Sequence, residues 1–378
     1  MDEKPTGKIE EHFGKIKDPR IGNATRHKLL DILIIAILAV ICGADGWSDV
    51  ELFGKSKKKW LRTFLALPHG IPSHDTFGRV FGLLDPQEFE RSFMSWVQTI
   101  QEITAGEMIA IDGKQLRGSR APGARREAID IVSAWAGKNQ LVVGEVKVDE
   151  KSNEITAIPK LLRLLDISGC LVTIDAIGTQ TEIAEMITER GGDYLLAVKE
   201  NQGQLYEDLQ ELFAGDHENG YAQPGYSYAR KVSNSHGRME IRQCWAISSE
   251  EYLDYVRSRG RWKGLQTLAM IVSERRTAEK TESKTRYYIS SRHLDAKAML
   301  KAKQEHWGIE NRLHWVLDMA FREDHCRVRK DHAPENFAII RHLAINMLRQ
   351  EKMVKAGIQA KRLKCGWDQD YLLAVLSG

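Results

Sequence analysis

Cysteine is scarce in this chain: there are five in 378 residues, and no two of them form a CxxC pair. Their scattered positions predict neither a disulfide framework nor a cysteine-based zinc site, and they fit a reducing cytoplasm. An excess of one charge is also lacking. The net charge is only +3, so the whole chain carries no strong electrostatic signal for nucleic acid. Any such signal must come from local clusters of charge.

A hydrophobic run of transmembrane length is missing as well. The apolar segment ILIIAILAVIC, residues 32–42, is shorter than the ~18 to 20 residues that a spanning helix needs. It also begins too far along the chain, and after too many charges, to be a signal peptide. We interpret it as a buried core helix, with a membrane segment as the alternative. The hydrophobic content of 42% and charged content of 28% are ordinary for a soluble globular protein.

The chain changes character near residue 100. Residues 1–100 predict an all-helical N-terminal domain with its own core, because apolar side chains recur there at helical spacing. Helices are expected at about 28–42, 49–65, 73–84 and 87–100, the third of them beginning at an N-cap, Ser73. From about residue 105, strand-like segments at 108–113, 128–136 and 140–148 predict three consecutive pairing strands.

The remainder alternates between strand and helix. A helix at 155–165, a strand at 170–176, a helix at 179–191 and a strand at 193–199 are expected in that order. Residues 201–265 are polar and predict a partly β insertion with a helix near 204–213 and a strand at 239–247. Strands at 265–273 and 285–291 follow, then closing helices, the first at about 304–321. This order predicts a mixed α/β sheet flanked by helices over residues 105–350, and a basic helical tail at 351–378.

Two carboxylates follow apolar strands in this α/β part. In EMIAIDGKQLRGS the apolar run ends at Asp112 and leads into a basic, glycine-containing loop, and in LVTIDAIG the run ends at Asp175. Side chains at the ends of neighbouring strands converge, and hard cations such as Mg²⁺ take oxygen ligands. Without a cation, clustered carboxylates repel and partly protonate. The alternative is that each Asp only caps the turn that follows its strand.

A third candidate lies in the segment HWGIENRLHWVLD. On a helix, His306, Glu310 and His314 fall at i, i+4 and i+8, beside an apolar stripe. Glu310 is then the third carboxylate of a magnesium site, or the three side chains form a zinc site, or the row is a surface that pairs with neighbouring arginines. The absence of an HExxH arrangement weakens the zinc interpretation.

The chain resembles an insertion-sequence DDE transposase of the H-repeat-associated family found with Rhs elements. The resemblance is carried by the segments HKLLDILIIAILAVICGADGW, GIPSHDTFGRVF, IAIDGKQLRGS, DEKSNEITAIPKLL, TIDAIGTQTEIAEMI, GGDYLLAVKENQG, SHGRMEIR, RYYISS and HWGIENRLHWVLDMAFREDHCRVR. These segments run over most of residues 12–350. The family has an RNase H-like catalytic core, so the resemblance implies that fold for residues 105–350.

The resemblance also implies a catalytic site and its partners. Asp112, Asp175 and Glu310 match the family's three acidic residues, which hold two Mg²⁺ ions, with Mn²⁺ as a substitute. The implied reaction is DNA cleavage at the element ends followed by strand transfer into target DNA. The implied partners are the terminal repeats, target DNA and a second copy of the chain or more, in a cytoplasmic, nucleoid-associated protein. The alternatives are a catalytically silent DNA-binding derivative and a magnesium-dependent nuclease that joins no strands.

One departure from the family is visible around the catalytic Glu. Many relatives carry a Tyr-x2-Arg-x3-Glu-x6-Lys pattern, and here Lys303, His306 and Leu317 stand where its Tyr, Arg and Lys are expected. The roles of those three side chains therefore do not transfer, although His306 remains a candidate phosphate contact.

Basic residues that follow the acidic segments, or that lie on the N-terminal helices, are the candidate DNA contacts. They are Lys114, Arg117, Arg120, Arg125 and Arg126 after Asp112, then Lys199, Arg238, Arg327, Arg329 and Lys330 farther along, and Lys55, Lys57, Lys58, Lys59, Arg62 and Arg79 in the helical domain. The helix beginning at Ser73 is the expected reader of the element ends in the major groove. Trp262 is expected in the core, with stacking on an unpaired base as the alternative.

Overall fold

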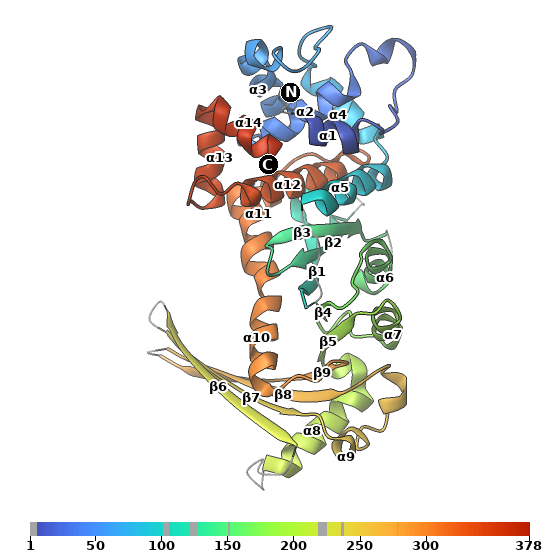
Figure 1. The fold of residues 1–378 in the computed structure, drawn as a ribbon, viewed down its shortest axis with the longest axis vertical. Helices are drawn as coiled ribbons and strands as arrows, with labels where there is room; N and C mark the ends of the chain where they lie inside the picture. The colour runs from blue at the N-terminus through green and yellow to red at the C-terminus, as the bar shows by residue number, and fades with distance from the viewer. Residues whose placement is uncertain are drawn as a thin grey trace.

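The computed structural model describes residues 6–100, 106–120, 127–149, 152–217, 225–235, 238–277 and 279–378. Helices gather at one end of an elongated molecule, and a long sheet runs from them to the other end (Figure 1). The helices are α1 (Gly7–Phe13), α2 (Leu29–Ile41), α3 (Trp47–Leu61), α4 (His74–Leu83), α5 (Pro86–Ile100), α6 (Glu154–Leu164), α7 (Thr181–Glu189), α8 (Gly203–His217), α9 (Glu250–Leu253), α10 (Ala296–His306), α11 (Trp315–Ala320), α12 (Ala333–Gln350), α13 (Ile358–Trp367) and α14 (Gln369–Ser377). The strands are β1 (Met108–Leu116), β2 (Ile129–Ala136), β3 (Leu141–Lys147), β4 (Leu171–Ile174), β5 (Asp193–Val198), β6 (Tyr226–Ser235), β7 (Arg238–Ile247), β8 (Thr267–Arg276) and β9 (Thr281–Ser290).

The nine strands form one mixed sheet in the order β3-β2-β1-β4-β5-β9-β8-β7-β6. The first three strands pair antiparallel, as predicted, and β1, β4 and β5 are parallel neighbours. This arrangement of β1 to β5, with helices on both faces, confirms the predicted RNase H-like α/β core. Strands β6 to β9 continue the same sheet in antiparallel fashion.

Helices cover both faces of the sheet. Helix α10 lies on one face, where Met299 and Leu300 pack with buried residues of β1, β4, β5, β7, β8 and β9. Helices α6 and α7 lie on the opposite face (Figure 1). Helix α8 shares that face, because Phe213 packs on Tyr287 of β9, whereas the next residue, Tyr288, faces α10. The core is therefore a three-layer sandwich.

The N-terminal helices form as predicted, but their core is not separate. Segment 32–41 is almost completely buried in α2, and Ser73 caps α4 by accepting a hydrogen bond from Thr76 N. One hydrophobic cluster runs from Ile9 through these helices into the sheet and α12. No helix in the described part of the chain is long and apolar enough to cross a membrane. The boundary near residue 100 is thus a change of secondary structure rather than a gap between two cores.

The C-terminal segment is helical, as predicted, and it packs back on the rest of the chain. Arg362 of α13 is 4% exposed and donates hydrogen bonds to Val40 O, at 2.7 Å, and to Ala320 O. Residues 351–378 therefore complete the helical end of the molecule (Figure 1).

Three local predictions need correction, and a fourth is confirmed. Strand β1 does not end at Asp112, because it stays paired with β2 as far as Leu116. Residues 201–265 are more regular than predicted: they hold the ten-residue strands β6 and β7. The helix predicted at 304–321 is α10, a π-helical segment η5 (Ile309–His314) and α11. Trp262 is 3% exposed, which confirms the core interpretation.

Helix α12 joins the helical end to the sheet through a buried amide. Strand β3 is an edge strand, and the amide of Asn346 replaces the missing neighbour: its Oδ1 accepts from Val142 N at 2.9 Å, and its Nδ2 donates to Val142 O at 2.8 Å. Both residues are fully buried. The backbone groups of Val142 therefore depend on this one side chain.

We expect Asn346→Leu to destabilise the chain by about 2 to 4 kcal/mol, because a buried N–H and a buried C=O would both lose their partner. Urea unfolding followed by circular dichroism measures the change. The matched control is Asn234→Leu on the exposed strand β6, where we expect almost no effect. Equal effects in the two variants would contradict this reading of the β3 edge.

Candidate active site

Two carboxylates come together because β1 and β4 are parallel and stop pairing at the same level. Ile111 and Ile174 are the last paired residues of the two strands. Asp112 and Asp175 are the next residues on each, so they occupy equivalent positions on strands about 4.8 Å apart. The sheet register therefore confirms that the two aspartates are neighbours.

Each aspartate also stabilises the backbone that follows it. Asp112 Oδ1 accepts from Gly113 N at 3.0 Å, and Asp175 Oδ1 accepts from Ile177 N at 3.0 Å. The capping role considered for single Asp residues is therefore present. It occupies one oxygen of each carboxylate, so it does not exclude a role for the other oxygen.

Glu310 reaches this place on the helix that crosses the same strands. Its segment, η5, is π-helical: Trp315 N bonds to Glu310 O, five residues earlier. Such turns occur often at functional sites. His306, four residues before Glu310, is hydrogen-bonded through Nδ1 to Thr173 Oγ1 of β4 at 2.9 Å. His314, four residues after it, places Nδ1 3.5 Å from Asp112 Oδ2. The two histidines fix the helix over β4 and β1, with Glu310 between them.

The charges of the other two carboxylates act on Asp112. Burial raises the pKa of Asp112 to about 7, and the negative charges of Asp175 and Glu310 contribute to the same shift. His314 supplies no countercharge: its pKa is lowered to about 3 by burial and by the charge of Lys114, so its contact with Asp112 is not an ion pair near neutral pH. The Asp112 carboxylate is therefore mostly shielded from water, repelled by neighbouring negative charges, and has no positive charge from His314 to offset its own.

A fourth carboxylate, which the sequence did not reveal, belongs to the same cluster. The charge of Glu154, in the first turn of α6, also raises the pKa of Asp112. Burial and the charge of Asp175 raise the pKa of Glu154 in turn. Glu154 fits there because residue 113 is glycine, and a Cβ atom at that position would collide with its carboxylate. In the sequence it looks like an ordinary acidic residue near a helix N-terminus.

The zinc interpretation of His306, Glu310 and His314 has no support in the geometry. The two histidines contact different strands, as described above. Throughout the described ranges, no three His, Cys, Asp or Glu side chains are close enough together to hold one metal ion as they stand. Asp112, Asp175 and Glu310 are likewise too far apart, as they stand, to hold one ion together.

The predicted DNA contacts after β1 are partly engaged within the protein. Lys114 forms ion pairs with three carboxylates: Asp318, at 2.6 Å, Glu323 and Asp324. Arg329 Nε donates to Gly118 O at 2.9 Å. Three other predicted DNA contacts, Arg117, Arg120 and Lys199, have exposed side chains. Arg125 and Arg126 lie outside the described residues.

The remaining predicted contacts lie far from the acidic cluster in the chain. On α3, Lys57 Nζ is 3.4 Å from Gly366 O, whereas Lys59 is exposed. Arg79 on α4 is exposed too, and Lys58 is half-buried. Arg238 on β7 pairs with Glu240. The helical end that carries Lys59 and Arg79 is separated from β7 by the whole core (Figure 1).

Two family models match almost the whole chain. Residues 10–97 match a domain described as DDE_Tnp_1-associated, and residues 104–347 match the transposase DDE domain. The chain belongs to the H-repeat family of DDE transposases. YhhI of Escherichia coli strain K12, named as H repeat-associated, is 43% identical over 376 residues, which is 98% of each chain. YbfL of the same strain is 42% identical over 376 residues, again 98% of each.

A solved structure of the piggyBac transposase synaptic complex with hairpin DNA is also similar to this DDE transposase. It has a TM-score of 0.43 and 14% identity, and the match covers 98% of this chain and 76% of that one. The family assignment rests on the sequence matches.

The charge on Asp112 gives a prediction for stability. Its pKa in the folded chain lies above its ordinary value of 3.8, so folding disfavours the ionised form, and stability falls as pH rises from about 4 to 7. Near pH 8, without divalent metal, we expect Asp112→Asn to be more stable than the wild type by about 2 to 4 kcal/mol. Near pH 4 the advantage should vanish.

Urea unfolding at several pH values in EDTA measures this difference. The control is Asp75→Asn, since the Asp75 side chain is 88% exposed and its removal should change little. A difference between Asp112→Asn and wild type that stays constant with pH would refute the assigned cause.

Proposed function

We propose that this DDE transposase cleaves DNA at the ends of its own element and joins the freed ends to target DNA, with Asp112, Asp175 and Glu310 as the catalytic residues. One observation supports the proposal above all others. Burial raises the pKa of Asp112, and the charges of Asp175 on the adjacent strand and of Glu310 on the helix raise it as well. A cluster of like charges is costly for a fold unless it binds a cation.

The donor set is suited to a divalent cation. Carboxylate oxygens are the ligands that Mg²⁺ prefers, and the neutral His314 leaves the Asp112 charge without a partner. Asp112, Asp175 and Glu310 would hold two Mg²⁺ ions, for which Mn²⁺ would substitute. When bound, the ions would lower the pKa of the attacking group and stabilise the leaving oxygen of the phosphodiester.

The protein residues then have separate tasks. The parallel strands hold Asp112 and Asp175 side by side, and His306 and His314 hold the Glu310 helix above them. In the first step, water attacks a phosphodiester at the element end and leaves a 3′-hydroxyl. In the second, this hydroxyl attacks a phosphodiester of the target DNA: its oxygen forms a new ester bond to the target phosphorus, and the 3′-oxygen of the cut target strand leaves as a hydroxyl.

Recognition of the element ends is proposed for the helical end of the molecule. Lys59 of α3 and Arg79 of α4 are exposed there, and the two helices are tied together because Glu51 accepts from His74 N at 2.8 Å. A rigid pair of helices with outward basic side chains suits a DNA groove. A dimer or larger assembly would act on paired ends.

We expect Asp112→Asn to abolish both cleavage and joining while it leaves DNA binding within about two-fold, because it removes one oxygen ligand and no basic residue. The assay supplies a labelled duplex with the natural element ends, Mg²⁺ and a target plasmid, and separates cleaved from joined products. Asp149→Asn is the control: this side chain is 65% exposed and forms a surface ion pair.

Three outcomes are distinguishable in this assay. Cleaved and joined products from the wild type support a transposase, cleavage alone indicates a nuclease, and binding without either product indicates a silent DNA-binding derivative. Retained cleavage by Asp112→Asn would overturn the assignment of this residue.

We further expect millimolar Mg²⁺ to raise the Tm of the wild type by about 2 to 5 °C, because binding to the folded state alone stabilises it. In Asp112→Asn the shift should be much smaller. Differential scanning calorimetry with matched ionic strength and an EDTA reference measures both. Equal shifts would contradict a metal site at Asp112.

A further inference from the structure

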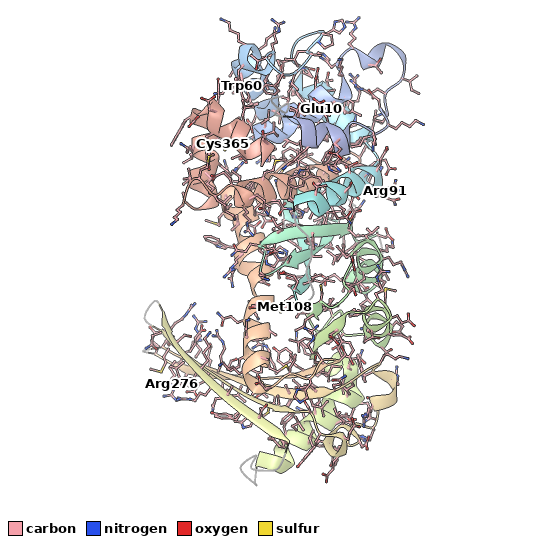
Figure 2. The ribbon with its side chains drawn as sticks, viewed as in Figure 1. Glu10, Trp60, Arg91, Met108, Arg276 and Cys365 are labelled. Carbon is pink, nitrogen blue, oxygen red and sulfur yellow. The ribbon has the colours of Figure 1, made fainter. Side chains whose placement is uncertain are left out.

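A groove lies along α10 and η5, the helical segments that lead to and carry Glu310, and Glu310 itself does not line it. It has a volume of about 1440 Å³. One wall is formed by α10 and η5, and the other by the outer ends of β7, β8 and β9. Figure 1 shows these strands curving away from α10, and Figure 2 labels Arg276 near their tips and Met108, a lining residue, on the core side.

The groove carries an excess of positive charge. Nine of the lining residues are Lys or Arg and four are Glu. Each of the four glutamates is paired with a nearby cation: Glu240 with Arg238 and Arg242, Glu274 with Arg276, Glu282 with Lys280, and Glu305 with Lys301. Six lining cations form no ion pair with any residue that the structure describes: Lys138, Arg275, Lys284, Arg286, Lys303 and Arg312.

Lys303 is the most unusual of these cations, because it is nearly buried. Its exposure is 8%, and it forms neither a hydrogen bond through its side chain nor an ion pair within the described ranges. Burial and the charges of Arg286 and Arg242 across the groove together lower its pKa to about 8. Burying an ammonium group among other cations is unfavourable unless an anion joins them.

The position of Lys303 relates the groove to the proposed chemistry. Lys303 precedes Glu310 by two helical turns, roughly 10 Å along the axis. That is the length of about three nucleotides of a stacked DNA strand. Trp307 lies between them, lines the groove and is 42% exposed. A strand with its reacting phosphate at Glu310 would therefore reach the groove within a few nucleotides.

We infer that this groove binds the phosphodiester backbone of the DNA strand that leaves the acidic cluster, with Lys303, Arg286 and Arg242 as its innermost contacts. The inference rests on the proposed function and adds a binding site to it. Arg238 was the only lining residue predicted to contact DNA from the sequence.

Several features favour a DNA strand over a small anion or an acidic peptide. The cations form a row. Lys284 and Arg286 are two residues apart on β9, so they lie on the same face, about 7 Å apart, and Arg275 of the neighbouring strand β8 lies beyond them. A row of charges suits a repeating phosphate. Trp307 is exposed enough for a base to stack on it. Free phosphate and polyglutamate have no base and could not make this contact.

The test compares DNA affinity at several salt concentrations. Fluorescence anisotropy with a labelled random-sequence duplex should show about ten-fold weaker binding for the double variant Lys303→Gln/Arg286→Gln, and a salt slope lower by roughly 1.5 to 2. Lys297→Gln, an exposed lysine of α10 outside the groove, should change binding little. Arg286→Lys keeps the charge and should keep the slope.

A second variant guards against a folding defect. Lys284→Gln/Arg275→Gln replaces two exposed side chains and should also lower the slope. Unchanged slopes in both double variants would overturn the inference, as would polyglutamate or inorganic phosphate competing as well as DNA of equal charge.

The outcomes separate this inference from the proposed function. If the wild type cleaves element ends but both double variants keep the full salt slope, the groove is refuted and the catalytic assignment stands. If no cleavage occurs but the slopes fall, the groove binds DNA and the catalytic proposal is the one that fails.

Discussion

The parallel pairing of β1 with β4 determines the character of the whole site. It ends at Ile111 and Ile174, so two aspartates follow side by side, each with one oxygen bound to the backbone after it. Two carboxylates so placed repel, and burial strengthens the repulsion because little water is near to screen it. The surrounding structure adds to this charge rather than relieving it, since the charges of Glu310 and Glu154 also raise the pKa of Asp112. Such an arrangement opposes folding and favours cation binding.

The helix above these strands is held by a hydrogen bond of His306 and a contact of His314 rather than by charge. His306 and His314 have lowered pKa values and act as neutral groups near pH 7. In an uninterrupted α-helix, residues eight apart point about 80° away from each other. The π-helical segment between the two histidines adds a residue to the turn, and both side chains reach the sheet. A distortion that is unfavourable for an isolated helix thus accompanies the segment from which Glu310 acts electrostatically on Asp112.

The sequence predicted those parts of the structure that depend on local pattern. Asp112 and Asp175 stood out because each follows an apolar run, and Glu310 because it lies in a polar row on an amphipathic helix. The RNase H-like order followed from the resemblance, and β1 to β5 confirm it. Glu154 was missed because its role depends on Gly113, a contact between segments far apart in the chain. Strand β6 was missed because its exposed, polar residues lack the apolar alternation of a half-buried strand.

The groove could not be predicted, because it depends on how far the strands extend beyond the helix that covers them. Strands β6 to β9 have ten residues each, whereas β4 and β5 have four and six. The longer strands twist away from α10 as they leave the core. On β9 the same face changes from apolar to cationic at this point: Tyr288 is buried against α10, while Arg286 and Lys284 line the groove. If these strands only extended the sheet into solvent, either positive or negative side chains would keep them soluble. Unpaired cations on both walls, one of them nearly buried, instead lower the stability of the free chain, and that loss is recovered when a polyanion enters between them.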